Sequence, residues 1–407
     1  MPLARSRARL AAGLLAAALV AAAGGDAHAA KAPSVKAPSA IVVDATTGKV
    51  LFAKSPDRRR AIASTTKLMT ALLAVRSTRP DQVIEAAPYT AAPVESKIDL
   101  RPGERMTARD LLRALLLESA NDAAATLARA VAGSQDAFVK RMNDEADRLG
   151  LANTAYANPI GFDNRHNYST ARDLSSLARR VLDDGTLARI VDLPRAKLAS
   201  GARPRTVQNR NRLVRSHPFV AGVKTGHTGE AGYVLVGAAE RDGGRVVSVV
   251  LGEPSEAARD SETLKLLRYG LSRYTRVHAV STVRALSLVP VNYFAGVRIP
   301  LHAAKDVQLS VPRGARVHTF VRLPFPLHLT GPMEAGTTVG EVTVTVDGRT
   351  AAKVPLVTGE KVPGGSWLRQ AAIDAGRTRP TLALGLIGVI LLALLQLRGP
   401  VVRLVRR

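Results

Sequence analysis

The stretch "ASTTKLMTALLA" (residues 63–74) begins with a small polar run and continues as an apolar helical pattern that contains a lysine. Lys67 follows Ser64 by three positions, so the two side chains share one side of a helix. The apolar neighbours would bury the lysine, and burial lowers the affinity of an amine for its proton. A neutral amine can deprotonate a serine hydroxyl, which is otherwise a poor nucleophile. The stretch therefore predicts Ser64 as a nucleophile and Lys67 as its base. We expect the helix to begin at Ser64, with its amino end directing backbone donors at developing negative charge.

Two further motifs lie downstream. "ESAND" gives Ser119-x-Asn121 at a break between two predicted helices, and "GVKTGHTGEAGY" gives Lys224-Thr225-Gly226 just before a predicted strand. Each motif alone is weak, because the first is also typical of a helix cap and the second of an exposed turn. The chain has one Ser-x-x-Lys and one Lys-Thr-Gly, and all three motifs fall within one predicted domain. Together they form the motif set of penicillin-binding proteins and related β-lactamases.

Hydrophobic periodicity divides the chain into two different regions. It predicts a hairpin around Thr47-Gly48, helices between residues 64 and 183, strands over residues 233–239 and 245–251, and a helix over residues 261–271. After about Tyr274 short alternating runs replace the helical patterns, and Asp347-Gly348 is typical of a tight hairpin turn. We expect a mixed domain over residues 30–275, an all-β domain over residues 276–358 and a linker over residues 359–380.

The two ends of the chain predict its location. Residues 1–29 combine early arginines, an apolar run and Ala27-His28-Ala29, the pattern of a secretory signal peptide. Residues 381–398 contain an uncharged run, typical of a transmembrane helix, and the arginine-rich residues 399–407 predict a cytoplasmic tail. We therefore expect an exported protein that is anchored in the cell membrane, with its catalytic domain outside the cytoplasm.

The amino-acid composition excludes several kinds of functional site. The absence of cysteine excludes disulfides, thiol nucleophiles and cysteine-ligated zinc. The formal net charge of +25 is spread along the chain and aromatic residues are only 4%, which disfavours a nucleic-acid partner and favours an anionic lipid or wall polymer. The eight histidines do not cluster at ligand spacing, and we expect no metal and no cofactor.

The region over residues 39–275 resembles the serine D-alanyl-D-alanine carboxypeptidases, the low-molecular-mass penicillin-binding proteins of peptidase family S11. Beyond the three motifs, the resemblance includes "AIVVDATTGKVLFAKSPDRRRAIASTTKLMTALLA", "YSTARDLSSLAR", "NRNRLV" and "GVKTGHTGEAGYVLVGAAERDGGRVVSVVLG". It implies an α/β fold of the β-lactamase/transpeptidase type, an antiparallel sheet flanked by helices plus an all-helical subdomain. It also matches the small all-β domain and C-terminal transmembrane helix.

The same resemblance implies the role of each site residue. Ser64 is acylated by peptidoglycan stem peptides or β-lactam antibiotics, and Lys67 takes its proton. Ser119 relays protons, Lys224 sets the local potential, and Asn121 binds the acyl chain and orients Lys67. The remaining predicted site residues bind substrate: Thr225 and Arg259 hold the terminal carboxylate, the backbone of His227 after Gly226 completes an oxyanion hole with that of Ser64, and Arg210 lies near the site.

The sequence disfavours other classes of hydrolase. A class A β-lactamase needs a glutamate that activates water, and none occurs between residues 146 and 229. An α/β-hydrolase elbow and a His-Glu-x-x-His zinc motif are both absent from the sequence. Two alternatives stay open: a D,D-endopeptidase that cuts cross-links, and a penicillin-binding sensor without turnover.

Overall fold

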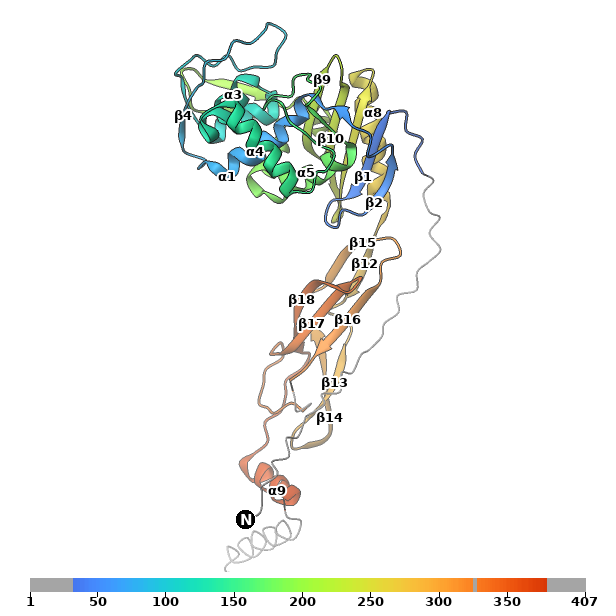
Figure 1. Cartoon of the computed structure of the whole chain (residues 1–407). Helices are drawn as coiled ribbons and strands as arrows, with labels where there is room; N and C mark the ends of the chain where they lie inside the picture. Colours follow the sequence, from blue (N-terminus) through green and yellow to red (C-terminus); the bar gives the residue numbers. More distant parts are fainter. Residues whose placement is uncertain (1–31, 325–327, 379–407) are drawn as a thin grey trace, which may run out of the picture. The chain divides into compact units, whose positions relative to one another are not determined.

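The computed structural model of the chain describes residues 32–324 and 328–378 (Figure 1). It divides into two compact units, one reaching to Thr275 with Ser310–Arg313, the other made of Arg276–Leu309 and the chain from Gly314. The predicted signal peptide, transmembrane helix and basic tail lie outside the described residues. Within the described ranges, no helix has the length and apolarity needed to cross a membrane.

The first unit is built on a five-stranded antiparallel sheet in the order β2-β1-β11-β10-β9. Its strands are β1 (Ser39–Asp44), β2 (Val50–Lys54), β9 (Val220–Thr228), β10 (Gly232–Arg241) and β11 (Gly244–Glu253). The start of the domain therefore pairs with its end, since Val43 lies opposite Val247. The Thr47-Gly48 hairpin and the two strands expected near residues 233–251 are present.

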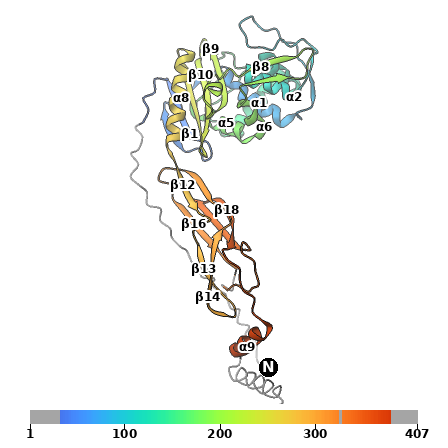
Figure 2. The same cartoon turned by 180° about the vertical axis from the view of Figure 1, so that it is seen from behind.

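Alternating side chains of this sheet enter two separate cores. Ile41 and Val43 pack on the side of the main helices, whereas Ala40 and Val42 pack against Leu266 and its neighbours in α8 (Glu256–Ser272). Helix α8 therefore covers one face of the sheet, and the other helices gather beside the opposite face (Figure 1, Figure 2).

The helices of the first unit form most of its larger core. They are α1 (Lys67–Ser77), α2 (Ala108–Arg113), α3 (Asn121–Ala132), α4 (Gln135–Arg148), α5 (Ala171–Asp183) and α6 (Gly185–Val191), with the 3₁₀ turn η1 (Ala63–Thr66) and the π-helical turn η2 (Ala114–Glu118). The short α7 (Leu213–Ser216) instead places Leu213 in the smaller core with α8. Short strand pairs complete the unit: β3 (Arg60–Ala61) with β6 (Tyr168–Ser169), β4 (Val83–Glu85) with β5 (Arg105–Thr107), and β7 (Arg195–Leu198) with β8 (Arg205–Gln208). Thr107 caps α2, because its side chain accepts a hydrogen bond from the Asp110 N–H.

Three local expectations differ from the structure. The α-helix begins at Lys67, not at Ser64, which lies in the preceding 3₁₀ turn. Lys224-Thr225-Gly226 lies inside strand β9, whereas the sequence placed it just before a strand. The segment expected as a linker, residues 359–380, contains helix α9 (Trp367–Thr378).

The second unit is all-β up to that helix, as its alternating runs predict. Its main sheet has the order β13-β14-β18-β17-β16, and β12 pairs with β15. The strands are β12 (Tyr274–Val280), β13 (Ser287–Val291), β14 (Phe294–Ala303), β15 (Val307–Pro312), β16 (Val317–Arg322), β17 (Thr338–Val346) and β18 (Arg349–Thr358). Asp347 and Gly348 both have positive φ (48° and 80°), which a two-residue turn between β17 and β18 requires.

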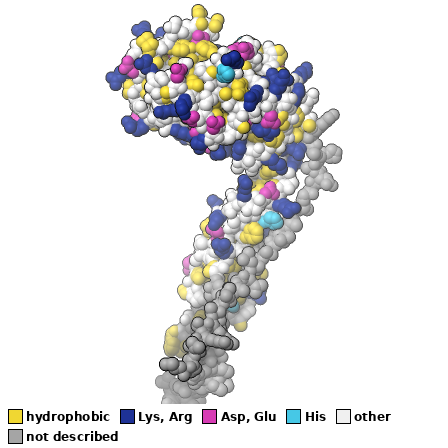
Figure 3. All heavy atoms as spheres, in the orientation of Figure 1, with side chains coloured by type: hydrophobic (Ala, Val, Ile, Leu, Met, Phe, Trp, Pro, Cys, Tyr) yellow, Lys and Arg dark blue, Asp and Glu magenta, His cyan; other side chains and the backbone are white. Residues whose placement is uncertain are grey.

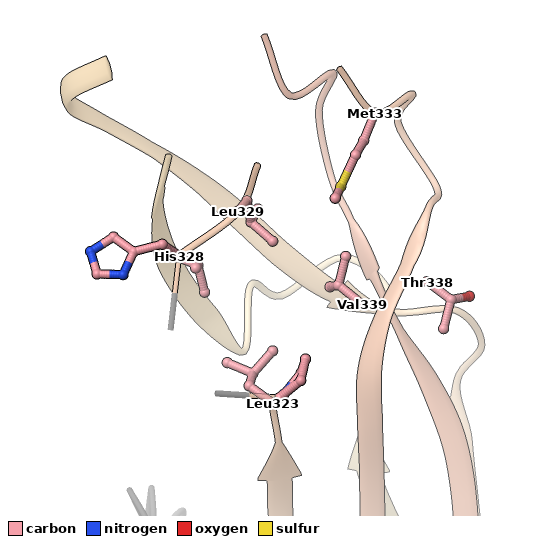
Figure 4. Close-up of a pocket in the computed structure, with 8 residues that line it drawn as sticks. Leu323, His328, Leu329, Met333, Thr338 and Val339 are labelled. Atoms are coloured by element: carbon pink, nitrogen blue, oxygen red, sulfur yellow. The ribbon is translucent and has the colours of Figure 1, made fainter. Parts of the chain in front are cut away.

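A cavity of about 310 Å³ lies in this second unit and is mainly apolar (Figure 4). Val289, Leu329, Met333 and Val339 are among the side chains that line it. No residue of the three sequence motifs lines this cavity, and all three motifs lie in the first unit.

Lysine and arginine side chains are scattered over the visible face of the first unit, among acidic and apolar ones (Figure 3). This face shows no single basic block of the kind that tracks a nucleic-acid backbone.

Candidate active site

The backbone at Ser64 is held in an uncommon conformation. Ala63, immediately before it, has φ of +47°, a left-handed value that β-carbons disfavour. Gly161 packs directly against this turn, because a Cβ built on it would lie 2.1 Å from the Ala63 carbonyl oxygen and 2.9 Å from the Ser64 nitrogen. Gly161 also has φ of +102°, so only glycine fits there without strain. The loop before β6 therefore fixes the position of the serine from outside its own helix.

Ser64 and Lys67 are within hydrogen-bonding distance. Lys67 Nζ lies 2.9 Å from Ser64 Oγ and 2.6 Å from the backbone oxygen of Ile160. The lysine is fully buried. Burial lowers the pKa of Lys67 well below its usual range, the charge of Lys224 lowers it further, and the carboxylates of Glu95 and Asp122 oppose both effects. A buried amine with reduced proton affinity next to a hydroxyl can act as a general base.

A second lysine–serine pair lies at the second and third motifs. Lys224 Nζ donates to Ser119 Oγ at 3.0 Å and to the backbone oxygen of Thr225 at 2.9 Å. Burial, and then the charges of Arg210 and Arg259, lower the pKa of Lys224 to about 7, while Glu118 acts in the opposite direction. Ser119 ends η2 with φ of +65°, so the break that the sequence predicted is a left-handed turn.

Asn121 begins α3 and contacts a residue that the sequence analysis did not single out. Its side-chain amide Nδ2 donates to Glu95 Oε2 at 2.9 Å, and its backbone N–H donates to the Ser96 carbonyl at 2.8 Å. The expected orientation of Lys67 by Asn121 has no direct hydrogen bond among the contacts of the described residues. Glu95 lies in an irregular segment between β4 and β5, where no motif or periodicity marks it.

Strand β9 carries the third motif along an edge of the sheet. A Cβ on Gly226 would lie 2.9 Å from the Ser64 nitrogen and 2.9 Å from the Ala63 Cβ, so glycine allows the strand to approach the serine turn. Thr225 is 7% exposed. The exposed His227 ring stacks on Tyr233 with centroids 4.0 Å apart. The structure thus brings the backbones at Ser64 and Gly226 together, and His227 follows directly.

The two arginines expected near the site differ in environment. Arg259 is buried in α8, where its guanidinium contacts Asp260 Oδ1 at 2.8 Å and Glu256 Oε1 at 3.2 Å. Its Cζ also lies 6.0 Å from the centroid of the Tyr233 ring. Arg210 keeps 54% of its side chain exposed and pairs with Glu118 at 2.5 Å. Both charges act on Lys224, which places them in its electrostatic neighbourhood.

Two family models match the chain. Residues 26–255 match the family model for D-alanyl-D-alanine carboxypeptidase, and residues 275–364 match the C-terminal domain of penicillin-binding protein 5. The chain is 32% identical to D-alanyl-D-alanine carboxypeptidase DacA of Escherichia coli, over 80% of this chain and 84% of DacA. It is 29% identical to DacF of Bacillus subtilis, over 79% of this chain and 84% of DacF.

Solved structures give the same result. The crystal structure of D-alanyl-D-alanine carboxypeptidase DacD from Francisella tularensis matches with a TM-score of 0.58 and 28% identity, over 82% of this chain and 95% of that one. Penicillin-binding protein 5 from Haemophilus influenzae matches with a TM-score of 0.57 and 28% identity, over 82% and 99%. The family model covers more than half of the chain, and the fold is of the penicillin-binding, transpeptidase-like α/β type with a C-terminal all-β domain. The chain therefore belongs to the D-alanyl-D-alanine carboxypeptidase family.

Proposed function

We propose that this D-alanyl-D-alanine carboxypeptidase removes the terminal D-alanine of peptidoglycan stem peptides, with Ser64 as nucleophile and Lys67 as base. One observation carries the assignment: Lys67 Nζ lies 2.9 Å from Ser64 Oγ, and the lysine is fully buried. Burial lowers the pKa of Lys67 well below its usual range, which favours the neutral amine, the form that can accept a proton.

Acylation begins when neutral Lys67 takes the Ser64 proton. The serine oxygen then attacks the carbonyl of the penultimate D-alanine and forms a tetrahedral intermediate. The backbone N–H groups of Ser64 and His227 stabilise its oxyanion, each contributing about 3 kcal/mol to lowering the barrier. The close approach of Gly226 to the Ser64 nitrogen supports this pairing of donors.

The intermediate collapses by breaking the C–N bond to the terminal D-alanine. The leaving nitrogen needs a proton, and Ser119 delivers it from its hydroxyl. Lys224, which donates to Ser119 Oγ at 3.0 Å, supports the resulting negative charge and can return a proton, because its pKa is about 7. Water then attacks the Ser64 ester and passes a proton to the neutral Lys224. Lys67 returns its proton to the departing Ser64 oxygen, and the shortened peptide is released as its carboxylic acid.

Thr225 and Arg259 bind the terminal carboxylate of the substrate in this proposal. Asp260 and Glu256 hold the buried guanidinium of Arg259 in one place, and a fixed cation binds a carboxylate more selectively than a mobile one. Arg210 adds positive potential from a more exposed position. A β-lactam with its carboxylate would use the same groups and acylate Ser64.

The decisive experiment compares products. A soluble form of the protein is incubated with muropeptides, and mass spectrometry follows both pentapeptides and cross-linked dimers. Loss of one alanine from pentapeptides, together with free D-alanine, is the expected result. Disappearance of dimers alone would mean D,D-endopeptidase activity, and penicillin labelling without any cleavage would mean a sensor.

We also propose export and membrane anchoring, supported by the sequence patterns of residues 1–29 and 381–407 alone. The peptidase domain over residues 30–275 and the β domain over residues 276–358 would then lie outside the cytoplasm. Fractionation of cells that produce the full chain, or a chain ending at Arg379, tests this. The truncated protein should leave the membrane fraction, and its retention would contradict the anchor.

A further inference from the structure

One carboxylate outside the three motifs reaches the candidate active site. Glu95 Oε2 accepts hydrogen bonds from Asn121 Nδ2 at 2.9 Å and from the hydroxyl of Tyr89. Glu95 Oε1 accepts from the Ala92 N–H at 2.8 Å. Asn121 is almost completely buried, so solvent does not reach its amide freely and the hydrogen bond to Glu95 orients it.

The chemistry of the two groups makes the contact directional. An asparagine amide has a donor end and an acceptor end, and an ionised carboxylate can only accept. Partial burial raises the pKa of Glu95, but hydrogen bonds from Tyr89, Asn121 and Ala92 outweigh it and keep the pKa below its usual value. An ionised Glu95 therefore requires Nδ2 of Asn121 to face it, and excludes the flipped amide.

The backbone fixes the same residue from a second direction. The Asn121 N–H donates to the Ser96 carbonyl at 2.8 Å, so two neighbouring residues of one segment hold both the main chain and the side chain of Asn121. With one Nδ2 hydrogen on Glu95, the other hydrogen and Oδ1 have fixed directions as well.

We propose that Glu95 is a positioning residue of the acylation step, which acts by holding the Asn121 amide in one of its two orientations. The inference rests on the proposed function, because it gives Asn121 a role in binding the acyl chain. Glu95 touches no reacting atom in this proposal.

The experiment measures the second-order rate constant for acylation of the full chain by a fluorescent penicillin. Glu95→Gln preserves the shape of the side chain but provides both a donor and an acceptor, so the Asn121 amide can flip. We expect acylation to slow about 10- to 100-fold, as small misplacements of catalytic groups do. Glu85→Gln makes the same exchange of a carboxylate for a carboxamide at an exposed position in β4. It is the matched control and should react like the parent.

A double-mutant cycle separates positioning from simple stabilisation of the segment. If Glu95 acts through Asn121, adding Glu95→Gln to Asn121→Ala should cause no further loss. Losses that multiply, or a Glu95→Gln variant that reacts like the parent, would overturn the inference. Tyr89→Phe keeps the Glu95–Asn121 contact and should lose much less; an equal loss would also overturn it. If Glu95→Gln melts early, Glu95→Asp serves in the same cycle.

The pH profile measures a second, through-space effect of the Glu95 charge on Lys67. Burial and the charge of Lys224 lower the pKa of Lys67, and the carboxylates of Glu95 and Asp122 raise it. The Glu95→Gln variant removes one of these carboxylates. Its loss should lower the pKa of Lys67 further and move the acid limb of acylation to lower pH. The double-mutant cycle decides the positioning role through Asn121. Labelling that persists in Ser64→Ala would instead refute the proposed function itself.

Discussion

Lys224 Nζ lies 3.0 Å from Ser119 Oγ, and the lysine is only 1% exposed. Burial is the largest reason why its pKa falls from 10.5 to about 7. Since the folded pKa lies below the unfolded one, the unfolded chain holds more protons between these values, and this group makes stability rise with pH. Below about pH 7 the folded protein bears the full cost of a buried charge.

Lys224→Met should therefore raise the melting temperature at pH 6 and raise it less as the pH approaches 10. The same variant should lose cleavage activity, because the proton relay through Ser119 is broken. Differential scanning calorimetry over this pH range checks the first point. A gain that is equal at pH 6 and pH 10 would show that the charge is not the cause.

Lys67→Arg should abolish acylation while the fold is retained. Arginine stays protonated and cannot take the Ser64 proton, so we expect a loss of about 10²- to 10⁴-fold in the acylation rate. Lys97→Arg, a charge-preserving exchange in the segment between β4 and β5, is the control. Stopped-flow or gel-based labelling with a fluorescent penicillin measures both variants, and normal acylation by Lys67→Arg at neutral pH would refute the base role.

Gly161→Ala should damage the site from outside the motifs. The new Cβ would meet the Ala63 carbonyl oxygen at 2.1 Å, and the residue would also keep a left-handed φ, so either the loop or the serine turn must move. We expect a lower melting temperature and an acylation rate reduced about tenfold or more. Gly229→Ala is a close control, because nothing lies within 4 Å of its Cβ position. Parent-like behaviour of Gly161→Ala would mean that the loop moves aside without disturbing Ser64.

Arg259→Ala should lower kcat/KM for substrates that carry a free terminal carboxylate. Removing one partner of a buried charge pair costs about 2–5 kcal/mol, and an amidated substrate has no such charge to lose. The comparison is therefore kcat/KM for free and amidated peptides in each variant. Arg268→Ala, on the exposed side of the same helix, should leave both values unchanged. If the preference for the free carboxylate survives in Arg259→Ala, another residue binds it.

The fold class could be predicted from the sequence because apolar and turn residues are distributed according to which side chains are buried and where the backbone turns. The apolar run of β1 and the Asp347-Gly348 turn express burial and backbone geometry directly, and the three motifs predict Ser64, Ser119 and Lys224 by residue type. The start of α1 was misplaced because the 3₁₀ turn is imposed by Gly161, which lies nearly a hundred residues away in sequence.

Contacts made by backbone atoms cannot be predicted in this way, because they do not depend on the type of side chain. The carbonyl of Ile160, which accepts from Lys67, would serve with almost any side chain at that position. Glu95 is different, because its side chain matters, but it lies in an irregular segment where a single glutamate has no periodicity to mark it. Only the closed fold brings either of them to the site.

The surroundings of Ser64 come from residues near positions 95, 119, 160 and 224, which are far apart along the polypeptide. Ser64 is made early during synthesis, but Lys224 lies in strand β9, so the surroundings are complete only after that strand has joined the fold. If Ser64 is the nucleophile as proposed, covalent labelling by penicillin therefore reports the folded fraction of a population, and labelling over time would follow its folding.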